Sequence, residues 1–135
     1  MRTASSLRLH SLWLTLGVFL IIVVIWASLT SDPPSTGFKF AYADKVSHLL
    51  AYAVLMGWFA QIFPARGSRQ WLVIGFILMG VLLEYAQALS ANRTYEVADM
   101  VANTLGVVLA WFFTRGAMGQ LLFRFEQFVF SRQAS

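Results

Sequence analysis

The stretch Ser11–Leu29, "SLWLTLGVFLIIVVIWASL", contains no charged residue and decides the class of protein. An apolar run of this length approaches the roughly 20 residues that an α-helix needs to cross a bilayer. The whole composition agrees, because 59% of the 135 residues are hydrophobic and only 12% are charged, against about 25% charged in a typical soluble domain. The sequence therefore predicts an integral membrane protein with a single domain.

Three further apolar stretches follow the first one. The four stretches are separated by prolines after the first one, by the segment Pro64–Arg69 and by a short polar hairpin before Val97. We predict an all-α bundle of four transmembrane helices, over residues 11–29, 46–63, 70–90 and 97–114. A cleaved signal peptide is the alternative for the first stretch, but its apolar run is long and no A-x-A site follows it. The other three spans would keep the same orientation.

Basic residues indicate how the bundle is oriented. Short loops on the cytoplasmic side of a membrane carry an excess of lysine and arginine. In the four-span arrangement seven basic residues fall on the side of the termini and three on the other side, Lys39, Lys45 and Arg93. We therefore expect both termini in the cytoplasm.

The last segment, residues 115–135, does not predict a fifth span. Its apolar part, Gly119–Arg132, is too short and carries Arg124 and Glu126. Such a segment is typical of an amphipathic helix that lies along the membrane surface. We predict a short interfacial helix on the cytoplasmic face.

Polar residues inside the predicted spans share one side of the membrane. Asp44, His48 and Tyr52 are spaced four residues apart, so they line one helix face, as do Asp99 and Asn103. Glu84 and Gln87 lie at the same depth, in the outer part of the third span. Ionisable groups facing lipid are costly, so these faces are expected to meet in a polar pocket that opens outward. Nothing comparable marks the inner half of the spans.

Each of these residues also has a simpler interpretation. Asp44 and Asp99 could stabilise helix starts, and Lys45 could extend its ammonium toward lipid headgroups. Tyr52, Gln87 and Asn103 could be hydrogen-bond partners between helices. Glu84 and His48 are harder to explain in this way, because a carboxylate within a span needs a proton or a partner. We expect His48 to hydrogen-bond Glu84, or Glu84 to be protonated, and Arg93 to pair with an acid at the start of the fourth span.

Taken in order, these residues resemble the VanZ-like family. Its pattern, D-K-x-x-H-x-x-x-Y, E-x-x-Q, R and D-x-x-x-N-x-x-G, is matched by residues between Asp44 and Gly106. The namesake of that family is linked to lowered teicoplanin susceptibility. The resemblance implies a small protein of the cell envelope, in the inner (plasma) membrane of a bacterium, with glycopeptide susceptibility as one expected connection.

Three functions follow from the predicted pocket. It could catalyse a reaction on a lipid-linked or anionic envelope substrate, bind such a headgroup without chemistry, or only specify how the helices pack. In the first case His48 is the general base or nucleophile, Asp44 or Asp99 orients it, and Glu84 is a second acid or base. The predicted substrate-binding residues are Lys45, Arg93, Tyr52, Gln87 and Asn103, with the two cations holding the anionic group.

The sequence predicts no cofactor, no metal site and no nucleic-acid partner. Cysteine is absent, and of the two histidines only His48 lies in a span core. Zinc sites usually recruit more nitrogen or sulfur ligands, and Lys45 and Arg93 would repel a cation. The net charge of +4 is spread along the chain, unlike the basic patch of a nucleic-acid-binding protein. The expected partner is a membrane lipid or lipid-linked headgroup, and the oligomeric state stays open.

Overall fold

The structure is a computed structural model that describes residues 7–30, 37, 42–90 and 94–132. These residues form α-helices, joined by turns and one short 3-10 helix, and the described part contains no strand. The elements are α1 (His10–Leu29), α2 (Ala43–Ile62), α3 (Arg66–Ala88), α4 (Val97–Phe113), η1 (Ala117–Gln120) and α5 (Leu121–Ser131). A helix occurs at each of the four predicted spans, which confirms the all-α prediction.

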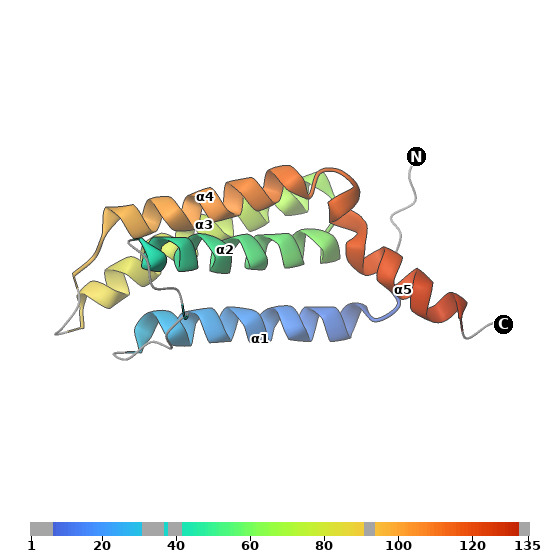
Figure 1. Cartoon of the computed structure of the whole chain (residues 1–135), viewed down its shortest axis with the longest axis horizontal. Coiled ribbons are helices and arrows are strands. Elements are labelled where there is room, and N and C mark those ends of the chain that lie inside the picture. The colour runs from blue at the N-terminus through green and yellow to red at the C-terminus, as the bar shows by residue number, and fades with distance from the viewer. Residues whose placement is uncertain (1–6, 31–36, 38–41, 91–93, 133–135) are drawn as a thin grey trace.

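The four long helices run side by side and alternate in direction (Figure 1). Helix α2 is central and makes its most extensive contact with α4, while α1 packs against α2 and α3. The core lies along α2, where Tyr52, Leu55, Met56 and Phe59 are buried, and Phe76 and Val107 join them from α3 and α4. This core fixes which faces of α2, α3 and α4 point inward, and so fixes where their polar residues meet.

Close contact between α2 and α4 depends on a glycine. A Cβ atom built on Gly106 would lie 2.2 Å from the backbone oxygen of Leu49 on α2. Small residues let helix backbones approach closely in membranes. Gly106 therefore sets the distance across which the first turns of α2 and α4 face each other.

The outer surface of the bundle is strongly apolar. In α1, Gly17 is the buried residue, whereas Phe19, Ile22 and Trp26 are exposed. An apolar surface of this extent does not suit water. Helices α1 and α3 are each long and apolar enough to cross a membrane, and α4 together with Ala117–Ser131, bent by 82°, would make a third candidate. Four crossings with cytoplasmic termini remain a prediction.

The predicted C-terminal helix is present as α5. It follows η1 and turns away from the axis of α4 at the end of the bundle where α1 begins (Figure 1). Leu122 and Glu126 are buried on its inner side, whereas Leu121, Phe125 and Phe128 are exposed. An exposed apolar stripe on a helix across the bundle end is consistent with the predicted position on the membrane surface.

The orientation can be tested by labelling, because the chain has no native cysteine. Gly67 is exposed in the first turn of α3, and Thr94 is exposed beyond the other end of α3, before α4 begins. In intact cells we expect Thr94→Cys to react with a membrane-impermeant maleimide and Gly67→Cys to react only after the membrane is permeabilised. The reverse pattern would place the termini outside, and labelling of both positions would contradict an α3 that spans the membrane.

Candidate functional site

The first turns of α2 and α4 bring the predicted polar residues together. Asp44, Lys45 and His48 lie on α2, Asp99 and Asn103 lie on α4, and Glu96 is the N-cap residue of α4. Acidic residues in a first turn are stabilised by the helix dipole, which gives Asp44 and Asp99 a local reason for their positions. These six residues are called the His48 cluster below.

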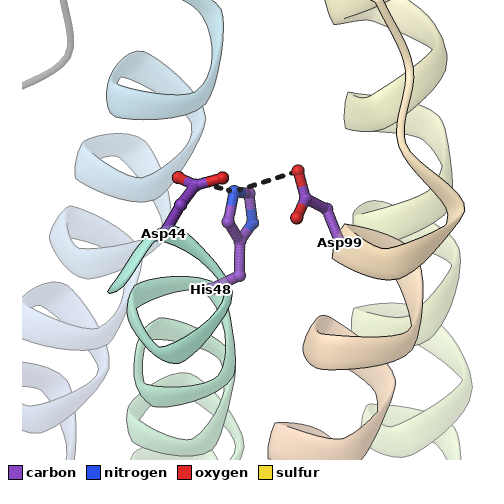
Figure 2. A group of neighbouring side chains, drawn as sticks. All are labelled: Asp44, His48 and Asp99. Atoms are coloured by element: carbon purple, nitrogen blue, oxygen red, sulfur yellow. Dashed lines mark ion pairs between the residues drawn. The ribbon is translucent and has the colours of Figure 1, made fainter. Parts of the chain in front are cut away.

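His48 lies between both helices and is hydrogen-bonded through one ring nitrogen. Its Nδ1 atom is 3.0 Å from Oδ1 of Asn103. Its Nε2 atom is 3.8 Å from Oδ1 of Asp44 and 3.7 Å from Oδ2 of Asp99 (Figure 2). A histidine with fixed orientation and acidic neighbours is the arrangement that general acid–base catalysis uses. Both carboxylates lie near Nε2, and the expectation that Asp44 or Asp99 orients His48 for catalysis stays a prediction.

Lys45 lies on the other side of the same carboxylates. Its ammonium pairs with Glu96 and Asp99, and it is 3.5 Å from Oδ2 of Asp44. Glu96 was not among the residues that the sequence predicted for the site. The ammonium is thus already neutralised by acids of the chain, so an incoming anion would have to compete with three carboxylates for it. This arrangement weakens the expected role of Lys45 in binding an anionic group.

Glu84 adjoins the cluster through the backbone. It is 1% exposed, and its Oε2 accepts a hydrogen bond of 3.2 Å from the N–H of Glu96. The expected hydrogen bond with His48 is wrong, because the ring nitrogens of His48 face Asn103 and the two aspartates instead. Helix α3 ends beside the first residues of α4 (Figure 1), so Glu84 reaches their backbone rather than the imidazole. Whether Glu84 is protonated stays a prediction.

Two other predicted residues point away from the His48 imidazole. Gln87 donates from Nε2 to the backbone oxygen of Ser28 at 2.7 Å, which ties α3 to the last turn of α1. Tyr52 is 2% exposed within the core, and its hydroxyl has no hydrogen-bond partner among the described residues. The bond of Gln87 between helices fits the simpler interpretation, whereas Tyr52 packs in the core and, within the described part of the chain, lacks the interhelical hydrogen bond that this interpretation expected. Arg93 lies outside the described residues, so its pairing with an acid stays a prediction.

A second polar network occupies the opposite end of the bundle, where none was expected. Arg69 donates from Nη1 to the backbone oxygen of Thr114 at 2.7 Å, and from Nε and Nη2 to that of Ala60. It thereby satisfies carbonyls in the last turns of α2 and α4, which helices leave unpaired. From the sequence, Arg69 was expected only to be a charged residue of the loop between the second and third spans. No local spacing identifies it, since its partners are distant in the chain.

Glu126 on α5 is the acidic member of this opposite end. Its carboxylate accepts hydrogen bonds from the backbone N–H of Arg8 and Leu9, at 2.6 and 2.9 Å, and from Nε1 of Trp13 at 2.7 Å. Burial opposes ionisation, but these bonds and the charge of Arg8 outweigh it and hold the pKa of Glu126 below its ordinary value. The end of the bundle opposite the His48 cluster therefore also contains buried polar groups, which the sequence did not lead us to expect.

A cavity of about 550 Å³ lies between α1, α2 and α3, away from the His48 cluster. Its walls are apolar apart from Ser68, and include Phe59, Trp71 and Phe76. None of the residues of the His48 cluster lines it. This cavity is therefore lined almost entirely by hydrocarbon and is separate from the His48 cluster.

The fold and the cluster define a small helical membrane protein with ionisable residues gathered at one end of the bundle. The chain belongs to the VanZ/LLP1 family, whose model matches residues 4–123. It is also 26% identical, over 98 residues, to a protein of Schizosaccharomyces pombe named "Uncharacterized protein C11E3.10". That match covers 70% of this chain and 59% of the yeast protein. No solved structure matches the chain significantly.

Proposed function

We propose that this protein acts on the polar headgroup of a lipid-linked envelope substrate, with His48 as the group that transfers the proton. The observation that carries the proposal is the position of the imidazole. It is fixed by Asn103 on one side and faces two carboxylates from α2 and α4 on the other. We place the His48 cluster at the outer leaflet of a bacterial inner membrane, in a bundle with four crossings and cytoplasmic termini.

The degree of exposure supports this assignment. The side chain of His48 is 18% accessible and that of Asp44 is 71% accessible, whereas that of Asp99 is 9% accessible. A headgroup at the membrane surface would therefore meet His48 and Asp44 directly, while Asp99 orients the imidazole from below. An oriented base within reach of a substrate proton contributes about 10²–10⁴-fold to a rate.

The charge of the cluster restricts the substrate. Within the described residues, Asp44, Glu96 and Asp99 outnumber Lys45, the cation that pairs with them. A bare phosphate or carboxylate would be repelled unless another cation accompanied it. The reacting group is therefore a hydroxyl, an amide or an ester of the headgroup, or a phosphate that brings its own counter-ion.

The proposal is tested by reconstituting the purified chain in phosphatidylglycerol vesicles that contain polyprenyl phosphates or a polyprenyl-linked sugar-peptide. Mass spectrometry of the extracted lipids measures conversion. We expect one of these classes to be converted, and His48→Asn to lower the rate about 100-fold or more. Gln127→Ala, an exposed change on α5, is the matched control. Absence of conversion, or equal rates for His48→Asn and the control, would contradict an enzymatic role.

A cellular measurement follows from the same proposal. If the substrate belongs to the envelope, loss of the gene should change teicoplanin susceptibility, and the wild-type gene but not His48→Asn should restore it. An equal restoration by both genes would separate any effect on susceptibility from proton transfer at His48.

One observation favours a purely structural function as the second candidate. Glu84 and Gln87 both bind backbone groups of other segments, the N–H of Glu96 and the oxygen of Ser28. These contacts tie α3 to α4 and to α1 and involve no ligand. If polar residues serve only packing, His48→Asn should lower the thermal midpoint of the purified protein without any change in lipid conversion or binding.

A further inference from the structure

We infer that Asp44, His48 and Asp99 form a binding site for a divalent transition-metal ion. Each residue offers one ligand atom, and the three atoms lie within 4.8 Å of one another. Nε2 of His48 is 3.8 and 3.7 Å from the carboxylate oxygens of Asp44 and Asp99. Metal bonds to such ligands are about 2.0–2.2 Å long, so an ion between the three atoms would reach all of them after small side-chain rotations (Figure 2).

The carboxylate oxygens are divided between Lys45 and His48. Lys45 contacts Oδ2 of Asp44 and Oδ1 of Asp99, whereas Nε2 of His48 faces Oδ1 of Asp44 and Oδ2 of Asp99. The ammonium therefore does not occupy the oxygens that a metal would use. It orients the two carboxylates from outside, as hydrogen-bonding groups around metal ligands commonly do. The objection from sequence, that Lys45 repels a cation, is weakened by this division.

The hydrogen bond between His48 and Asn103 also supports a metal site. A carbonyl oxygen can only accept, so Nδ1 of His48 carries the hydrogen and donates it to Oδ1 of Asn103. In the neutral ring, Nε2 then presents its lone pair to two carboxylate oxygens. That contact is repulsive unless a positive charge lies between Nε2 and the two oxygens, and a metal ion would supply it. Histidines that bind metals usually donate their other N–H to an oxygen in this way.

The charge of the His48 cluster suits a divalent ion. Within the described residues, the three carboxylates of Asp44, Glu96 and Asp99 surround one ammonium, which leaves two negative charges that a divalent ion would balance. Water screens the charges of Asp44 and Glu96, whose side chains are 71% and 52% accessible. Asp99 is only 6% exposed, so it gains most from a nearby cation.

The ligand types restrict the ion. Imidazole suits zinc, iron and copper, and carboxylates suit manganese as well. One imidazole with two carboxylates therefore favours Zn²⁺ or Mn²⁺ over Mg²⁺, which prefers oxygen ligands and retains its waters. Three protein ligands leave coordination positions open, as in catalytic rather than structural zinc sites. Such an ion would also supply the counter-charge for a phosphate headgroup. Nε2 of His48 cannot bind the ion and take up a proton at the same time, so metal binding and proton transfer by His48 are alternative states of this site, and metal binding itself requires no catalytic function.

The test is metal binding by the full chain, purified in detergent without a histidine tag and stripped with chelator. After dialysis against Zn²⁺ and gel filtration, mass spectrometry measures metal per chain, and Co²⁺ in place of Zn²⁺ reports the ligand geometry by visible absorption. We expect equimolar binding in the wild type. His48→Asn and Asp99→Asn should abolish it, and Asn103→Ala should weaken it about 10–100-fold.

Two controls and one further ligand variant make the result specific. His10→Asn removes the other histidine of the chain, and Gln127→Ala changes an exposed residue of α5; both should retain binding. Asp44→Asn changes the most exposed ligand and is the variant that best preserves folding, yet it should lose affinity at least tenfold. The inference is overturned if the wild type takes up no equimolar metal. It is equally overturned if monodisperse His48→Asn and Asp44→Asn bind as the wild type does.

Discussion

Gly106→Ala is expected to destabilise the bundle by about 3 kcal/mol or more, the upper range for overpacking a core. The added Cβ would lie 2.2 Å from the backbone oxygen of Leu49 and 3.0 Å from the backbone nitrogen of Ala53. Because both atoms belong to the backbone of α2, no side-chain rotation relieves the clash. Helices α2 and α4 must separate, and this also separates His48 from Asp99.

Two other glycines provide a graded comparison. A Cβ on Gly17 would lie 2.8 Å from the ring of Phe59, a side chain that can move, whereas a Cβ on Gly57 would meet nothing within 4 Å. Gly57→Ala should therefore be neutral or stabilising by up to about 1 kcal/mol, since alanine favours helices. The destabilisation by Gly17→Ala should be smaller than that by Gly106→Ala and larger than that by Gly57→Ala. Thermal midpoints measured in one detergent rank the three variants by stability. If Gly106→Ala and Gly57→Ala had equal midpoints, α2 and α4 would not be in close backbone contact at Gly106.

Glu126→Gln is expected to release α5 from the start of α1 and to cost about 1–3 kcal/mol. The carboxylate accepts three hydrogen bonds, with Oε2 facing the N–H of Arg8 and Oε1 facing Leu9 and Trp13. Glutamine keeps one oxygen but presents an NH₂ group to the remaining donor. One buried N–H then loses its acceptor, and the attraction to Arg8 is lost as well.

The same residue gives a dependence on pH. The pKa of Glu126 is lower in the folded protein than its ordinary value of 4.5. Its stabilisation is therefore complete above pH 4.5 and is lost as the pH falls through the folded pKa. The difference in thermal midpoint between the wild type and Glu126→Gln should shrink in that acidic range. Gln127→Ala, exposed on the same helix, is the control and should follow the wild type at every pH.

If the difference between Glu126→Gln and the wild type were the same at pH 7 and in strong acid, the contribution of Glu126 would not come from its ionised form. If Glu126→Gln matched Gln127→Ala at neutral pH, α5 would be held by its apolar contacts alone, chiefly those of Leu122 with Leu7 and Ile62.

The sequence by itself determined the helices and the polar faces. Apolar run length and the breaks at Pro64 and before Val97 placed four helices close to their observed bounds. The spacing of four residues put Asp44 and His48 on one face, because a helix repeats every 3.6 residues. The cost of exposing such groups to lipid then required the faces of α2 and α4 to meet, as they do. These are consequences of local periodicity and of the membrane as solvent.

Only the tertiary structure decided which partner each polar group takes. Glu84 meets the backbone of Glu96 rather than His48, Gln87 meets Ser28, and Lys45 is shared among three acids. Arg69 and Glu126, which looked like loop and surface charges, join the ends of distant helices. Periodicity shows which face of a helix is polar, but the axial offset and rotation between two helices decide which atoms come within bonding distance. That offset is set by long-range packing such as the contact of Gly106 with α2, and no local spacing in the sequence encodes it.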